Sequence, residues 1–208
     1  MSDFKKNILK KVQKKLEESG FKKSSLGLSY RFFGADLIGT ISLSTGKGLR
    51  ADELAIWPMI GARNQKIGRL VSDIKGQKFN KFYPLHACTN IGYLMPENKW
   101  KTFIFCEINP CEKTIRELLD SVERYAVPFM WRVAQLDELV KAIGVERISN
   151  PETRIYHIPA GLFLLGDIEG SKSFLDETLE MFSSRKNPAS ENFRLFAVGL
   201  RQKIEKSQ

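Results

Sequence analysis

Apolar residues at the start of the chain recur with the spacing of a helix. Ile8, Val12 and Leu16 lie four residues apart, which places them on one face of a helix over residues 2–18. Gly20 ends the pattern, as glycine commonly does just after a helix. We therefore predict an amphipathic first helix whose other faces are rich in lysine.

The period of the apolar pattern then changes from four to two, which predicts strands. A hairpin is expected around the turn at residues 34–36, and Pro58 indicates that the third strand lies at a sheet edge or carries a bulge. A short helix bearing Ile67 and Val71 should end at Gly76. The predicted strands cover residues 26–32, 37–45, 54–60, 85–94 and 101–108.

Strand signals stop after residue 108, and helical periodicity continues to the end of the chain. Asn109 and Pro110 are a helix start signal, and Pro128 should end that helix. Four more helices are predicted, at residues 129–143, 153–165, 171–184 and 189–206. The pattern predicts an α+β fold: an N-terminal helix with a mainly antiparallel sheet of about five strands, followed by an all-helical C-terminal region.

Charge divides the chain at the same place. Residues 1–108 carry 19 Lys and Arg against 9 Asp and Glu, whereas residues 109–208 carry 14 against 15. We expect a basic α+β region over 1–108 that faces something anionic and a helical region over 109–208, with one shared core as the alternative. Three cysteines without framework spacing, no secretory leader and no membrane-spanning apolar run indicate a cytoplasmic protein.

Three stretches together resemble a bacterial family of unassigned role, the domain of unknown function catalogued as 4304. They are residues 18–23 (ESGFKK), 116–129 (RELLDSVERYAVPF) and 136–140 (LDELV), within a resemblance that covers about residues 3–143. The resemblance implies an α+β fold in a bacterial, non-secreted setting. It brings no catalytic residues with it.

His86, Cys88, Cys106 and Cys111 are the residues whose chemistry suits a metal, because three thiolates and an imidazole would form a closed tetrahedral zinc site. The tight Cys-x2-Cys spacing is missing, so we favour the interpretation of buried core thiols and predict no cofactor. A thiol nucleophile would need Cys88 beside His86 or His157. We favour inert thiols and structural histidines here too.

Lysine alternates with aromatic residues in one segment of the basic region, which is typical of surfaces that bind single-stranded nucleic acid. The segment contains Lys75, Lys78, Phe79, Lys81, Phe82 and Tyr83. Lys10 and Lys14 of the first helix would extend this surface. A lysine-rich face that is simply solvated is the alternative interpretation.

Large aromatic residues near turns suggest contact with another protein instead. Trp57, Phe129, Met130 and Trp131 are anchors of the kind that dominate protein interfaces, although a core position is the more common one for large aromatic residues. We favour a non-enzymatic binding, adaptor or immunity-like protein that acts through a protein partner. Association with nucleic acid through the lysine-rich half is the alternative, and the sequence does not indicate an oligomeric state.

Overall fold

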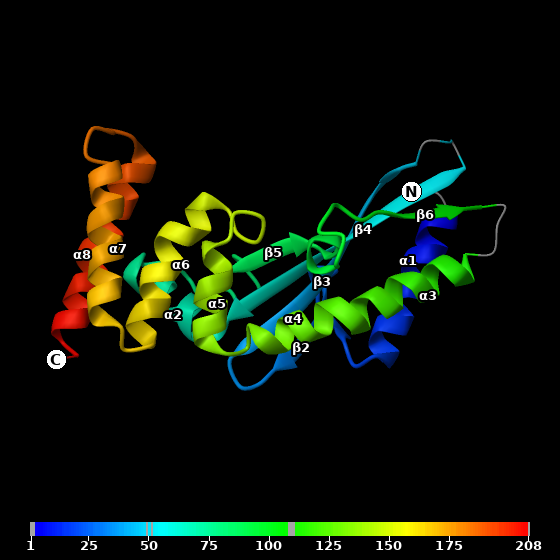
Figure 1. Cartoon of the computed structure of the whole chain (residues 1–208), viewed down its shortest axis with the longest axis horizontal. Coiled ribbons are helices and arrows are strands. Elements are labelled where there is room, and N and C mark those ends of the chain that lie inside the picture. The colour runs from blue at the N-terminus through cyan, green and yellow to red at the C-terminus, as the bar shows by residue number, and fades with distance from the viewer. Residues whose placement is uncertain (1–2, 49, 51, 108–110, 208) are drawn as a thin grey trace. The chain divides into compact units, whose positions relative to one another are not determined.

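A computed structural model describes residues 3–48, 50, 52–107 and 111–207, and it has the predicted α+β fold (Figure 1). The strands are β1 (Lys22–Lys23), β2 (Ser29–Phe33), β3 (Leu37–Lys47), β4 (Glu53–Asn64), β5 (Ala87–Asn90) and β6 (Phe103–Cys106). They form one sheet in the order β1-β2-β3-β4-β5, and β6 also pairs with β4. The pairs β1–β2, β2–β3 and β4–β6 are antiparallel.

Helices precede, interrupt and follow the sheet. They are α1 (Asp3–Glu18), α2 (Gln65–Ile74), the 3-10 helix η1 (Ile91–Leu94), α3 (Glu112–Ser121), the π-helix η2 (Val122–Ala126), α4 (Val127–Arg132), α5 (Leu136–Gly144), α6 (Pro151–Leu164), α7 (Ile168–Met181) and α8 (Pro188–Glu205). No helix within the described ranges is long and apolar enough to cross a membrane.

The chain divides into two compact units that interleave along the sequence. Unit 1 contains residues 1–62 and 88–132, and unit 2 contains residues 63–87 and 133–208. Helices α3 and α4 therefore belong with the sheet, whereas α2 belongs with the C-terminal helices. The charge boundary at residue 108 does not coincide with this division.

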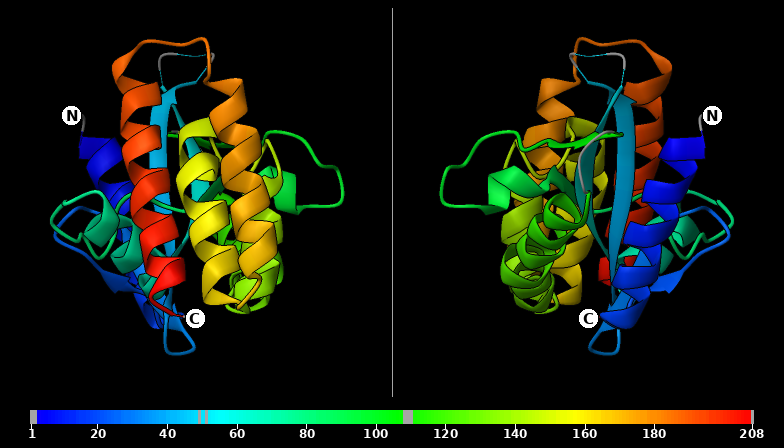
Figure 2. Two further views of the ribbon diagram at one scale, coloured as in Figure 1. Left: turned by 90° about the vertical axis from the view of Figure 1, so that its left-hand side faces the viewer. Right: turned by 90° about the vertical axis from the view of Figure 1, so that its right-hand side faces the viewer.

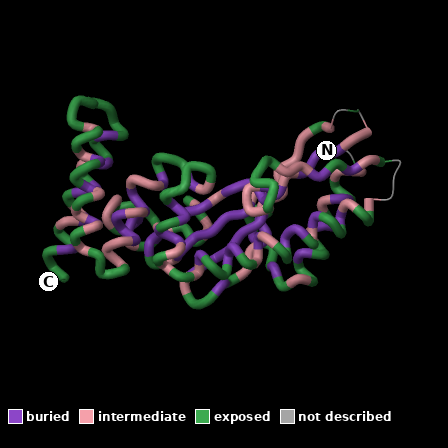
Figure 3. The backbone as a smooth tube through the Cα atoms, in the orientation of Figure 1, coloured by how far each residue is buried: buried purple, intermediate pink, exposed green. Residues whose placement is uncertain are grey.

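The core of unit 1 lies where α1, α3 and the sheet meet. Ile8, Val12 and Leu16 of α1 are buried, as the periodicity predicts. The purple stretches of Figure 3 follow β3 and β4, whose residues are buried along much of their length. Gly20 adopts a φ of +85° directly after α1, a conformation that glycine reaches without strain.

Gly39 on β3 marks a close contact inside unit 1. A Cβ added there would lie 2.4 Å from Sδ of Met130 and 2.7 Å from the ring of Phe33. We expect Gly39→Ala to lower the free energy of unfolding by about 1–3 kcal/mol, the usual cost of overpacking a core. Urea denaturation measures it, and Gly144→Ala, where a Cβ would meet nothing within 4 Å, is the control.

Unit 2 is built from α2 and the C-terminal helices. Helices α6, α7 and α8 pack against one another and are seen side by side in Figure 2. Gly161 of α6 lets this helix approach α5, because a Cβ there would lie 2.5 Å from Cγ2 of Val140. Four of these helices begin with a side-chain cap, provided by Asn64 for α2, Asn150 for α6, Asp167 for α7 and Asn187 for α8. The helices predicted at residues 2–18, 153–165, 171–184 and 189–206 are thus confirmed within a few residues.

Of the two alternatives that Pro58 predicts for the third strand, an edge position or a bulge, the edge position is wrong. Strand β4 has neighbours on both sides, with β3 on one side and both β5 and β6 as further partners. Residues 53–56 pair with β6, and Pro58 follows just after them. Pro58, which has no N–H to donate, thus lies beyond the residues that pair with β6.

Two other element boundaries predicted from the sequence differ from those in the structure. The apolar run at 85–94 forms only a short strand, because the Asn90 side chain accepts from the N–H of Gly92 and starts η1. Pro128 does not end a helix: the π-helix η2 precedes it and the chain continues helically into α4. The predicted start at Asn109 and Pro110, like Ile108 in the last strand, lies outside the described residues.

The helix predicted at 129–143 is two helices. α4 ends at Arg132, and α5 begins at Leu136 after Gln135, which has an extended backbone. The apolar residues on either side share a helical period, so the pattern alone does not reveal the break.

Candidate functional site

A groove of about 870 Å³ runs along α1 in unit 1. It is lined by residues of α1, β1, the turn that follows β1, and β3. We call it the α1 groove; its lining consists of Leu9, Leu26, Leu28 and Leu43, of Lys6, Lys10, Lys14 and Lys23, and of Gln13, Glu17, Gly27 and Ser42. Leucine and lysine thus make up two thirds of its lining residues.

The helical period explains how lysines come to line the groove. Lys6, Lys10 and Lys14 lie four residues apart and form one row along α1, two positions away from the buried row of Ile8 and Val12. The row spans about 12 Å, or about two turns. Since a shift of two positions turns a helix by about half a revolution, the lysine row faces away from the core.

Leucine side chains in the groove are accessible although apolar. Leu26 is 54% exposed, and Leu9 and Leu43 are half-buried. Gln13 links the two walls: it accepts a hydrogen bond from Ser29 Oγ at 3.0 Å and donates one to Glu17 at 3.2 Å. Exposed apolar surface bordered by charge is typical of a binding surface.

Other lysines of α1 are neutralised by carboxylates. Lys11 Nζ lies 2.8 Å from Glu112 of α3, and Lys15 Nζ lies 2.7 Å from Glu18. The hydrogen bond to Glu112 raises the pKa of Lys11, and the same bond lowers the pKa of Glu112. These lysines therefore already have an acidic partner at the surface, Lys11 on α3 and Lys15 within α1.

Lysines of the α1 groove form fewer ion pairs with carboxylates of the protein. Lys6 has Asp3 as a partner at 3.5 Å. Within the described part of the chain, no ion pair forms to Lys10, Lys14 or Lys23. Three cationic side chains of the groove are thus available to an anionic ligand.

The alternating lysine and aromatic segment lies in unit 2, apart from the α1 lysines of unit 1. The ring of Phe79 lies under the guanidinium groups of Arg69, at 4.3 Å, and Arg63, at 5.4 Å. Lys75 Nζ lies 3.9 Å from the ring centroid of Tyr156. Two members of the proposed nucleic-acid surface are therefore engaged within unit 2.

The remaining residues of that segment are more accessible. Tyr83 is 43% exposed, Lys78 and Lys81 are exposed, and Phe82 is half-buried with Lys81 Nζ 5.7 Å from its ring centroid. The structure thus leaves part of the predicted surface open to solvent.

Two of the four predicted protein anchors are buried. Phe129 is 4% exposed, and Met130 is fully buried against Gly39 and Phe33, so neither reaches a partner from this position. Trp131 is 51% exposed and stacks edge-on against Phe33 at 5.2 Å. Trp57 is half-buried beside Trp100, with ring centroids 6.5 Å apart.

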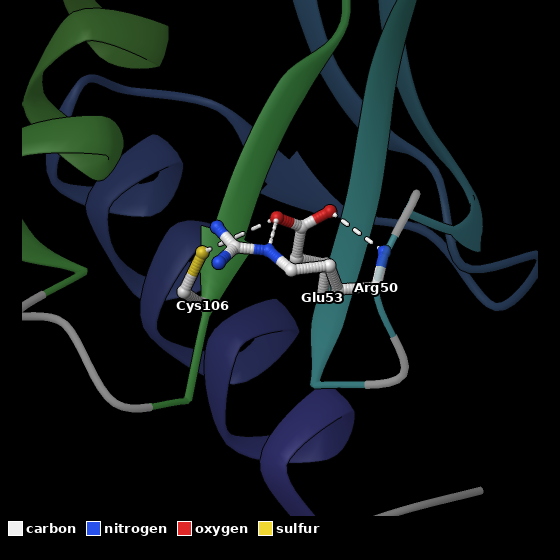
Figure 4. A network of polar contacts seen from close by, with 3 residues as sticks. All are labelled: Arg50, Glu53 and Cys106. Carbon is white, nitrogen blue, oxygen red and sulfur yellow. Dashed lines mark hydrogen bonds and ion pairs between the residues drawn. The ribbon is translucent and has the colours of Figure 1, made fainter.

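The cysteines Cys88, Cys106 and Cys111 lie in unit 1, and Cys106 contacts Glu53 at the start of β4. Figure 4 shows the Glu53 carboxylate between Arg50, whose Nε lies 2.8 Å from Oε1, and Cys106, whose Sγ lies 3.9 Å from the same oxygen. Cys111 Sγ lies 3.3 Å from the Cys106 carbonyl oxygen. Burial raises the pKa of the Cys111 and Cys88 thiols, which disfavours a nucleophilic thiolate at neutral pH.

The four residues considered for zinc do not come together as a site. Among the residues that the structure describes, no group of three or more His, Cys, Asp or Glu side chains is placed to hold a metal ion. His86 contacts Arg63, the Asn64 backbone and the ring of His157 instead of a thiol.

Sequence reasoning included Lys10 and Lys14 but missed the leucines of the α1 groove. Leu26 carries the clearest signal, because it is an exposed apolar residue in the turn before β2, close to the buried Leu28. In the sequence, Lys23 is only one of many lysines in the N-terminal region. Its place in the groove depends on how β1 lies beside α1.

Comparison with known proteins adds no relative. No family model, no curated protein sequence and no solved structure matches this chain. The resemblance to the family of unassigned role stays a prediction.

Proposed function

We propose that this protein is a non-enzymatic cytoplasmic binding protein whose α1 groove takes an acidic, amphipathic helical segment of a partner protein. The observation that carries the proposal is the combination of accessible leucines with the unpaired Lys10, Lys14 and Lys23 in one groove. An amphipathic helix offers an apolar face to leucines and, with Glu and Asp on its flanks, charge to the lysines.

The size of the groove fits such a segment. The lysine row from Lys6 to Lys14 covers about two helical turns. A ligand helix of three to four turns would place apolar residues at i, i+3, i+4 and i+7 against Leu9, Leu26 and Leu43. Burial of these leucines supplies affinity, and the lysines favour acidic partners over basic ones.

Nucleic acid is the alternative ligand, and the groove supports it less well. Proteins that hold single strands combine basic residues with aromatic rings on which bases stack. The α1 groove contains leucine and lysine and no aromatic residue among its lining. Tyr83, the exposed ring of the alternating lysine and aromatic segment, belongs to unit 2.

Titration with a designed peptide tests the proposal. The probe is a fluorescent 18-residue helix with leucine at i, i+3, i+4 and i+7 and glutamate elsewhere, and a lysine-for-glutamate version is its control. We expect the acidic peptide to bind and the paired substitution Lys10→Glu with Lys14→Glu to weaken binding at least tenfold, because both charges then repel the ligand. Leu26→Ser should weaken binding similarly at any salt concentration.

A matched variant and a second probe separate the alternatives. Lys186→Glu with Lys203→Glu makes the same change of charge on exposed positions of unit 2 and should bind the peptide as the wild type does. Binding of a single-stranded oligothymidine that falls steeply with salt, without peptide binding, would replace this proposal with the nucleic-acid alternative.

A further inference from the structure

Unit 2 contains a small cavity that neither the α1 groove nor the proposed function uses. Its volume is about 150 Å³. It lies between α2, the segment that follows α2, and the first turns of α6. Residues with polar side chains line most of it, among them Arg63, Ser72, Lys75, Gln77, Tyr156 and His157.

Arg63 is the central feature of this cavity, because its charge is fully buried without a counter-ion. The side chain is 0% exposed, and its Nη1 donates to the carbonyl oxygen of Pro84. Nε and Nη2 have no hydrogen-bond partner among the residues that the structure describes. Burial lowers the pKa of Arg63 to about 10, so the guanidinium remains charged at neutral pH. Buried arginines are normally paired with an acid, and no acid within the described part of unit 2 fills that role here.

The two unpaired atoms lie on the same edge of the guanidinium. The N–H groups of Nε and Nη2 point side by side, and this edge binds both oxygens of a carboxylate or two oxygens of a phosphoryl group. The contact with Pro84 uses Nη1 and leaves that edge unused. The guanidinium therefore donates a hydrogen bond to the protein through Nη1, and the edge formed by Nε and Nη2 is the part that can bind two oxygens of a ligand.

The histidines beside Arg63 supply little acceptor capacity. The Asn64 N–H donates to Nδ1 of His86 at 3.1 Å, while Arg63 Nη1 lies 3.3 Å from Nε2 of the same ring. A neutral imidazole accepts at only one nitrogen, so two donors compete for one lone pair. His157 Nδ1 lies 2.7 Å from the Thr153 carbonyl oxygen and donates to it. The surroundings of Arg63 thus contain more donors than acceptors.

A second cation lines the same cavity. Lys75 lies at the end of α2 and rests over the Tyr156 ring. Glu152 is the acidic residue in the lining, and its side chain is exposed at the start of α6. Two cations therefore face one solvated carboxylate, which leaves the cavity electropositive.

Gly68 makes room for the guanidinium against α2. A Cβ at this position would lie 2.6 Å from Nη2 and 2.8 Å from Cζ of Arg63. Glycine inside a helix lowers stability relative to alanine. At this position the missing side chain leaves the space that Arg63 occupies. A larger residue would displace the edge that has no partner.

We propose that this cavity is a binding site for a small oxyanion, a carboxylate or a phosphoryl group, held bidentately by Arg63 Nε and Nη2 with Lys75 as the second cation. The volume admits a ligand of a few heavy atoms, or the anionic end of a larger molecule. The site lies in unit 2, so its test does not depend on whether the α1 groove binds a peptide.

Anion titration tests the proposal on the full chain. Sodium phosphate and sodium acetate are compared with sodium chloride at equal ionic strength and pH 7.5, by thermal denaturation and calorimetry. We expect phosphate or acetate to raise Tm saturably, by about 3–6 °C at ten times Kd, and chloride to have no such effect. Saturation by phosphate alone assigns a phosphoryl ligand, and saturation by acetate alone assigns a carboxylate.

Variants distinguish a binding site from a structural arginine. Lys75→Met should weaken anion binding about tenfold, whereas Lys203→Met, the same change at an exposed position of α8, should leave it unchanged. The NMR signal of the Arg63 Nε–H, identified by its loss in Arg63→Lys, should shift on titration. Gly68→Ala should abolish binding even if it folds less stably. A Tm response equal in Lys75→Met and Lys203→Met, an unmoved Nε–H signal, or no response beyond that to chloride would overturn the proposal.

Discussion

Phe193→Ala is expected to lower the free energy of unfolding by about 3–5 kcal/mol, as large aromatic truncations in protein cores do. Phe193 of α8 is fully buried, with ring centroids 5.6 Å from Phe182, 5.9 Å from Tyr156 and 6.2 Å from Phe196. Its removal leaves a cavity among α6, α7 and α8. Urea denaturation followed by fluorescence measures the shift of the midpoint.

Leu195→Ala is the matched control for this prediction. Leu195 lies on the same helix two residues later and is 72% exposed. We expect a change within about 0.5 kcal/mol, the usual range for surface substitutions. Equal losses for the two variants would show that α8 does not pack as described.

Lowering the pH from 7 to 5 is expected to cost roughly 3–4 kcal/mol of stability. The chain has two histidines, both buried: burial holds the pKa of His86 well below 6.5 and that of His157 at about 4. Below pH 6.5 the unfolded chain binds protons that the folded chain does not, so each unit of pH favours unfolding by roughly 1 kcal/mol per histidine. The contribution is fully present above 6.5 and is lost as pH falls toward the folded pKa.

The acids held in ion pairs titrate below this window, which separates their effect from that of the histidines. Ion pairs lower the pKa of Glu18, Glu112 and Asp137, so the stability they contribute is lost only at more acidic pH. His157→Gln should remove about half of the slope between pH 7 and 5. A variant with the wild-type slope would mean that His157 is not buried in the neutral form.

Local patterns predicted the helices well and the long-range arrangement poorly. Ile8, Val12 and Leu16 predicted α1, because this signal depends on residues a few positions apart. The helical chain continues through Pro128 because a π-helical turn precedes this residue, and the apolar pattern does not predict such a turn.

The candidate sites also depend on contacts between distant residues, which local patterns do not predict. Lysine periodicity identifies a cationic helix, but Lys11 is neutralised by Glu112, which is 101 residues away in sequence. Arg63 looks like an ordinary surface residue next to a helix cap. Its burial depends on Pro84, His86 and the missing Cβ of Gly68, and these come together only in the folded chain.

The most direct test of the proposed function is to locate the acidic peptide on the protein by NMR. An ¹⁵N-labelled chain is titrated with the designed glutamate and leucine helix, and amide shifts are mapped. We expect the largest shifts at Leu9, Leu26, Gly27 and Leu43, with little change in unit 2, and their loss in Lys10→Glu with Lys14→Glu. Shifts confined to unit 2, or none at saturating peptide, would contradict the assignment of the α1 groove as the binding site.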